Sequence, residues 1–152
     1  MTMTPTTDIA QRQRAAATRL REAAAALKAE LAGTDDEKAQ LGSQWSLNDT
    51  VRHMGLRLAS PFEQMERLMR GDRPDLGARA RRPQHWANAQ QRAVEDLEQT
   101  AAYAEGLSPE QAACAGLRDG EPLAVIDLLE FLAHHAWEHI EQVREIKARE
   151  SL

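Results

Sequence analysis

Two histidines one helical turn apart are the residues of this sequence best suited to metal chemistry. His135 and His139 stand four residues apart in the segment His-Ala-Trp-Glu-His. On a helix, this spacing puts two side chains on one face with Cβ atoms about 5–6 Å apart. Two imidazoles can then reach one ion with metal–nitrogen bonds of about 2.0–2.1 Å. The spacing therefore predicts a divalent-metal site, although it also occurs in helices that bind no metal.

The neighbouring positions indicate that the two rings point inward. Aliphatic residues at helical spacing lead up to the pair and continue beyond it: Val125, Leu128, Leu132 and Ile146. An inward imidazole with an unpaired ring nitrogen costs desolvation free energy, and a metal ion would offset that cost. His134 lies on the acidic face of the same helix, where we expect it to be solvated. We expect His85 to lie at the surface or to cap a helix.

A third ligand is available in His53. Three polar residues follow it at helical spacing, at Arg57, Ser60 and Gln64. Three protein ligands and one open position are typical of a catalytic metal site. On this reading the polar stripe borders an interior cleft and binds substrate, and Arg57 attracts an anionic ligand. The alternative is that this polar stripe faces water and that Arg57 is an exposed surface residue without a binding role.

Two other metal chemistries do not fit the sequence. The segment matches the H-x-x-E-H pattern of inverzincin proteases, but too few residues follow His139 to supply a ligand from another element. A di-iron bundle needs Glu-x-x-His on two helices. The residues three positions before the histidines are Thr50, Leu132 and Ala136, none of which is a carboxylate.

Four long helices are predicted to position these side chains. Apolar periodicity and end signals place them at about 7–32, 46–70, 84–105 and 122–148, with Pro61 bending the second. One further helical turn fits within 34–44. Ser108 and Gln111 form a capping box for a short extra helix before the last long one. The sequence thus predicts an all-α four-helix bundle, formed by one domain over residues 1–152.

Composition limits the classes of function. The 152 residues include 19 Lys and Arg against 24 Asp and Glu, which gives a net charge of −5 and argues against nucleic acid as the main partner. No apolar run approaches the ~20 residues of a membrane span, and no signal-peptide stretch is present. The one cysteine, Cys114, cannot form an internal disulfide. We therefore expect a soluble protein of the reducing cytoplasm.

These motifs resemble those of the DinB/YfiT-like superfamily, a group of four-helix metalloproteins. In the second predicted helix, Trp45-Ser46 is followed by His53, eight residues after the tryptophan. The last helix carries the two histidines of H-x-x-x-H and then Gln142. The chain departs from the family pattern at Gly55, where a bulky apolar residue is usual. Helix order and length agree over nearly the whole chain.

The resemblance implies a function as well as a fold. It implies a bundle that is often dimeric and a divalent metal, commonly nickel or zinc, held by His53, His135 and His139. Characterised relatives include bacillithiol-conjugating transferases and a mycothiol-dependent maleylpyruvate isomerase. We therefore expect a thiol S-transferase or isomerase, in which the metal makes a low-molecular-weight thiol nucleophilic towards an electrophilic substrate.

Two alternatives remain open, and the oligomer is a separate expectation. The chain would in one case be a stress-linked metal-binding or interaction protein without turnover, and in the other its histidines would be a packed polar core without metal. We also expect a homodimer. Phe131 and Trp137 are aromatic residues on the otherwise polar arc of the last helix, which makes them candidate interface anchors.

Overall fold

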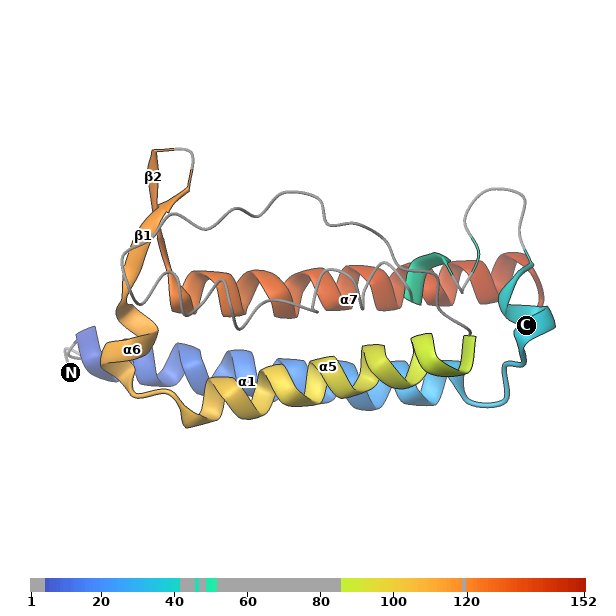
Figure 1. Cartoon of the computed structure of the whole chain (residues 1–152), viewed down its shortest axis with the longest axis horizontal. Helices are drawn as coiled ribbons and strands as arrows, with labels where there is room; N and C mark the ends of the chain where they lie inside the picture. Colours follow the sequence, from blue (N-terminus) through green and yellow to red (C-terminus); the bar gives the residue numbers. More distant parts are fainter. Residues whose placement is uncertain (1–4, 42–45, 47–48, 52–85, 119) are drawn as a thin grey trace.

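The structure is a computed structural model that describes residues 5–41, 46, 49–51, 86–118 and 120–152. Its long helices are α1 (Pro5–Leu31), α5 (Trp86–Gly106) and α7 (Val125–Arg149), and its short ones are α2 (Asp36–Ala39) and α6 (Pro109–Ala113). The long helices lie side by side, with α1 and α7 running in one direction and α5 in the other (Figure 1). The predicted predominance of helix is confirmed.

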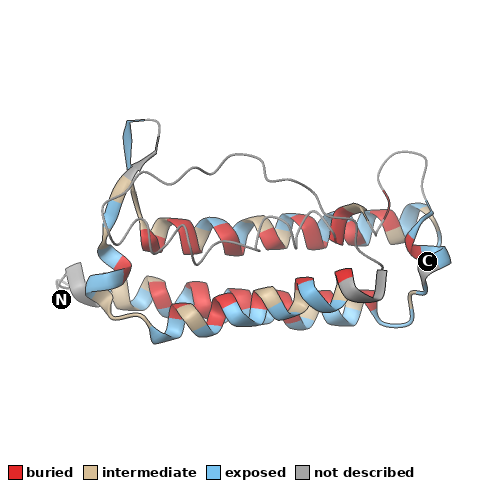
Figure 2. Cartoon of the chain, viewed as in Figure 1, coloured by how far each residue is buried: buried red, intermediate tan, exposed pale blue. Residues whose placement is uncertain are grey.

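The core of the described part is formed where α1 meets α5 and α7. Small and medium aliphatic side chains on α1 are fully or almost fully buried, and α5 and α7 also carry rows of buried residues, coloured red in Figure 2. The α1 face consists of Ala16, Ala17, Leu20, Ala23, Ala24, Leu27 and Leu31. Alanine allows the helix backbones to approach closely, while each buried leucine contributes about 1.5–3 kcal/mol.

Polar contacts at the start of α7 lock it to α1. The Arg12 guanidinium donates to Asp127 Oδ1 at 3.0 Å and pairs with both carboxylate oxygens of Glu130. Asp127 also caps α7, because its second oxygen accepts a hydrogen bond from the Ala124 N–H at 2.9 Å. A carboxylate in the first helical turn interacts favourably with the helix dipole as well.

A second polar contact joins the far ends of the same two helices. Glu30 accepts from Arg144 Nε at 3.1 Å and from Lys147 Nζ at 3.0 Å. These contacts, with Lys147 the larger influence, lower the pKa of the Glu30 carboxyl. The register of α1 against α7 is therefore fixed at both ends.

The capping residues predicted from the sequence form the expected hydrogen bonds. Ser108 and Gln111 make a complete capping box at α6. Ser46 and Asp49 make the same reciprocal pair, with both bonds at 3.1 Å, and so mark the start of the second predicted helix. The rest of that helix, Pro61 included, lies outside the described residues. Gly33 ends the first helix region with φ +77°, which favours glycine.

The prediction of an all-α chain is wrong at one place. Residues 122–124, predicted as the first residues of the last helix, belong to an antiparallel hairpin of β1 (Ala115–Arg118) and β2 (Glu121–Ala124), and α7 begins only at Val125. Arg118 pairs with Glu121, so two residues connect the strands. Gly120, the second of them, has φ +81°, a conformation that favours glycine and that two-residue hairpin connections use.

We predict that Gln13→Leu lowers the free energy of unfolding by about 1–3 kcal/mol. Gln13 is 6% exposed, and its amide donates to the Ala104 carbonyl at 2.5 Å and the Leu107 carbonyl at 2.6 Å. Carbonyls at the end of α5 lack helical partners, so leucine leaves them unsatisfied. Urea denaturation measures the loss. The exposed Gln11→Leu is the matched control, and an equal effect of both would contradict this role.

Candidate metal centre

The rings of His135 and His139 converge on α7. Their Nε2 atoms are 2.9 Å apart, and the ring planes are nearly perpendicular, at 87°. His139 is 6% exposed and belongs to the core, while the His135 side chain is 15% exposed. The predicted inward orientation is confirmed for His139, whereas His135 is partly buried.

Gln142 determines which nitrogen of His139 carries its proton. The Gln142 side-chain oxygen lies 2.7 Å from His139 Nδ1. An amide oxygen only accepts, so a neutral His139 must hold its proton on Nδ1 and leave a lone pair on Nε2. With this tautomer, the lone pair on His139 Nε2 can accept a hydrogen bond from His135 Nε2 across the 2.9 Å between them.

The same space has the size and donors for a metal ion. Two nitrogens bound at about 2.0–2.1 Å are roughly 2.9 Å apart for a 90° angle at the metal and roughly 3.4 Å apart for a tetrahedral one. The observed 2.9 Å separation therefore suits the first geometry, and a small ring rotation would reach the second. A carbonyl-type oxygen on the other ring nitrogen of a histidine is a frequent partner of metal-binding imidazoles.

Other groups on α7 surround the two rings. The Phe131 ring stacks on the His135 imidazole, with centroids 5.5 Å apart and planes at 13°. Glu138 Oε2 lies 3.7 Å from His135 Nδ1. The other Glu138 oxygen pairs with His134 at 2.9 Å, and the His134 side chain is 64% exposed, as its position on the acidic face predicted.

The remaining predicted site residues lie outside the described residues. They are His53, Arg57, Ser60 and Gln64, together with His85. Within the part of the chain that the structure describes, no three His, Cys, Asp or Glu side chains gather as metal ligands. The third ligand and the substrate-binding stripe therefore stay predictions.

Trp137, one of the two predicted interface anchors, is partly covered by its own chain, and its role in a dimer stays a prediction. Its side chain is half-buried, and its indole N–H donates to the Arg19 carbonyl of α1 at 3.2 Å. The Arg144 guanidinium lies over the indole, 5.9 Å from the ring centroid. Trp137 thus packs between helices of the same chain, whereas Phe131 remains 38% exposed.

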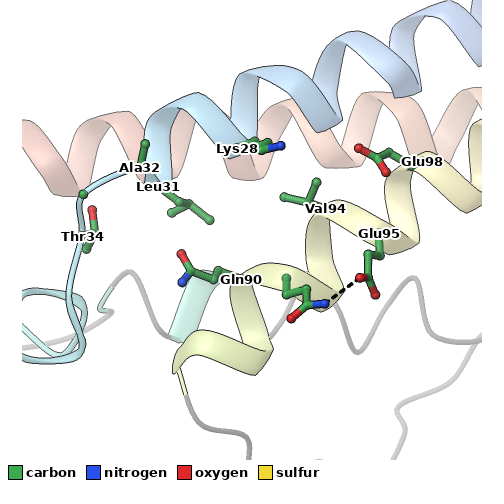
Figure 3. A pocket seen from close by; sticks show the side chains of 10 residues that line it. Lys28, Leu31, Ala32, Thr34, Gln90, Val94, Glu95 and Glu98 are labelled. Atoms are coloured by element: carbon green, nitrogen blue, oxygen red, sulfur yellow. Dashed lines mark hydrogen bonds between the residues drawn. The ribbon is translucent and has the colours of Figure 1, made fainter.

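A groove between the end of α1 and the first half of α5 is a separate feature. It has a volume of about 670 Å³ and a charged lining that includes Lys28, Glu95 and Glu98 (Figure 3). Gln91 donates to Glu95 across its wall at 2.8 Å. Neither His135 nor His139 lines this groove.

We predict that metal-free neutral His139 is the Nδ1–H tautomer, as its contact with Gln142 requires. Long-range ¹H–¹⁵N NMR of the histidine rings distinguishes the two tautomers. Gln142→Leu removes the oxygen and should release the preference, whereas Gln11→Leu, at an exposed position on α1, should leave it intact. An Nε2–H tautomer in the wild-type protein would contradict this assignment.

Comparisons with protein-family models, with curated proteins and with solved structures gave no match. None of the helices in the described ranges is both long and apolar enough to span a bilayer.

Proposed function

We propose that this chain binds one divalent metal ion, nickel or zinc, through His53, His135 and His139. The observation that carries the proposal is the convergence of two Nε2 atoms in a mostly buried position, with Gln142 on the outer nitrogen of His139. This arrangement supports the proposal, because metal-binding imidazoles usually have a hydrogen-bond acceptor on the ring nitrogen that does not bind the metal. The resemblance to DinB/YfiT-like proteins supplies His53 as the third ligand.

The proposal includes a fourth long helix that brings His53 to the site. The described start of this segment favours it, because Thr50 and Val51 are both fully buried and the Ser46–Asp49 capping box begins a helix there. A helix continuing from this cap would complete a four-helix bundle with α1, α5 and α7. One face of such a helix carries His53 and, one turn later, Arg57.

We propose further that the site activates a low-molecular-weight thiol for transfer to an electrophile or for isomerisation. A divalent ion with three neutral imidazole ligands keeps its full charge, and so lowers the pKa of a bound thiol. Gln142 orients His139, and the aliphatic core beside it restricts water. Arg57, Ser60 and Gln64 would bind the anionic and polar groups of the substrate.

Oligomerisation and location belong to the same proposal. Phe131 is more than one-third exposed and stacks on the His135 ring. A homodimer contact at Phe131 would therefore lie beside the histidine pair. The single Cys114 suits a reducing cytoplasm. Without turnover, the same ligands would make the chain a metal-binding protein of non-catalytic function.

We predict one metal ion per chain in protein purified without an affinity tag. Alanine at position 53, 135 or 139 should abolish stoichiometric binding, because two ligands in an open site hold the ion too weakly. His134→Ala and His85→Ala are matched controls that should retain the metal. Elemental analysis measures the content. Full metal content in His53→Ala would show that the third ligand is wrongly assigned.

We also predict thiol-dependent turnover that requires the metal. The metal-loaded protein should consume a thiol and an electrophile from a panel of both, and chelation should abolish the reaction. Removing the Arg57 guanidinium, as in Arg57→Met, should weaken binding of an anionic thiol by about 1.5–3 kcal/mol while metal content stays the same. Metal binding without turnover for any pair would instead support the non-catalytic function.

A further inference from the structure

Asp96 is a mostly buried carboxylate that the proposed function does not use. It lies on α5 with a side chain 15% exposed, and its Oδ2 atom is buried without a hydrogen-bond partner. Arg92 Nε is 3.9 Å from this oxygen, too far for a hydrogen bond. The Thr100 hydroxyl, one turn later, donates to the Asp96 backbone carbonyl instead.

Burial has a clear effect on this carboxyl group. Desolvation raises the pKa of Asp96 from 3.8 to about 6, with Arg92 lowering it and Glu95 raising it by smaller amounts. Arg92 and Glu95 are also on α5. The charged α1 side chains that reach α5 are Arg21, which pairs with Glu105, and Lys28, which lines the groove beside Glu95. Near neutral pH the carboxylate is therefore largely ionised, and one buried oxygen is available to a donor.

Contacts with α1 locate Asp96 along the bundle. On α5 it lies between Glu105, which pairs with Arg21 at 2.5 Å, and Val94, which lines the groove with Lys28. Asp96 is therefore level with the segment of α1 between residues 21 and 28.

His139 is level with an overlapping segment of α1, between residues 19 and 30. On α7 it lies between Trp137, which reaches the Arg19 carbonyl, and Arg144, which reaches Glu30. Since α1 touches both helices, Asp96 and His139 stand at overlapping heights along the bundle.

Asp96 also lies on the side of α5 that faces the α7 half of the molecule. Nine residues separate it from Glu105, which places the two on opposite sides of a helix with about 3.6 residues per turn. Glu105 pairs with Arg21, and Arg21 is nine residues from Arg12, the α1 residue that binds α7. Glu105 thus lies away from α7, and Asp96 lies towards it.

The histidines have the corresponding position on α7. His135 is two residues from Trp137, about 160° around the helix. Trp137 contacts α1, so the imidazoles lie on the flank of α7 that is turned away from that contact. Asp96 on α5 and the two imidazoles on α7 are thus mostly buried, lie away from the Arg21 and Trp137 contacts with α1, and stand at overlapping heights along the bundle.

We propose that Asp96 binds an ammonium group on the thiol ligand of this site, opposite the histidines. The inference rests on the proposed function and narrows its substrate to thiols that carry a protonated amine. A buried carboxylate oxygen without a donor is completed by a cationic N–H donor, which forms a stronger hydrogen bond than a neutral one.

The test compares two thiol series on nickel-loaded protein. One is a homologous series of ω-aminoalkanethiols, and the other is the n-alkanethiols that replace the ammonium by methyl. Calorimetry should show at least one amine bound about 10-fold or more tightly than its isostere, as a hydrogen bond to a charged group provides. Asp96→Asn should remove this preference without changing alkanethiol affinity or nickel content. Glu98→Gln, an exposed charge on the same helix, should preserve it.

Any other result of these binding experiments contradicts either the metal site or the role of Asp96. If the wild-type chain takes up no nickel, both the metal site and the role of Asp96 fall. If it takes up nickel but prefers no amine, or if Asp96→Asn keeps the preference, only the Asp96 inference falls.

Thermal melting gives a second readout. A raised pKa means that the ionised carboxyl destabilises the fold, so Asp96→Asn should melt higher near neutral pH, and this gain should shrink as pH falls through about 6. A lower melting temperature near neutral pH would make Asp96 a structural acceptor.

Discussion

Helix α1 holds α5 and α7 in place through one continuous face of alanine and leucine, with polar contacts at both ends. The small side chains bring the backbones close, and aliphatic burial stabilises the contact. Specific polar contacts then fix the position of each neighbouring helix along α1. Gln13 binds carbonyls at the end of α5, while Arg12 and Glu30 form ion pairs with the two ends of α7. Because α5 and α7 are both held at specific positions along α1, their positions along the bundle relative to each other are also determined. The positions of side chains between α5 and α7 depend on the same contacts.

The buried polar side chains on α5 and α7 differ in whether they have hydrogen-bond partners. His139 is buried, yet Gln142 binds one of its nitrogens and His135 approaches the other. Buried polar networks of this kind rigidify a core when every member has a partner. Asp96 Oδ2 is the buried side-chain atom without one in the described part of the chain. Under the proposed function, a metal ion would take the place of the contact between the two rings, and an amine-bearing thiol would supply the donor that Asp96 Oδ2 lacks.

Features that depend on residues close together in the sequence were mostly predicted correctly. The errors lie at features that depend on contacts between helices or between strands. The capping pairs at Ser46 and Ser108 act over three residues, so their hydrogen bonds were predictable. The sequence indicated a turn at residues 119–122 but not the two strands beside it, because strands of four residues show little alternation. The polar arc around Trp137 indicated solvent, but α1 binds that arc through ion pairs. Gln142 follows His139 at helical spacing and was therefore readable. The unpaired state of Asp96 depends on packing between helices, which no local pattern contains.

The most direct measurement is the anomalous scattering of metal in crystals of the tag-free protein. The account predicts one peak per chain about 2.0–2.2 Å from the Nε2 atoms of both His135 and His139, with His53 as a third ligand. Data collected on both sides of the nickel and zinc absorption edges would identify the element. A refined structure in which His135 still donates to His139 across an uninterrupted 2.9 Å contact, while the bound metal scatters elsewhere, would contradict the account.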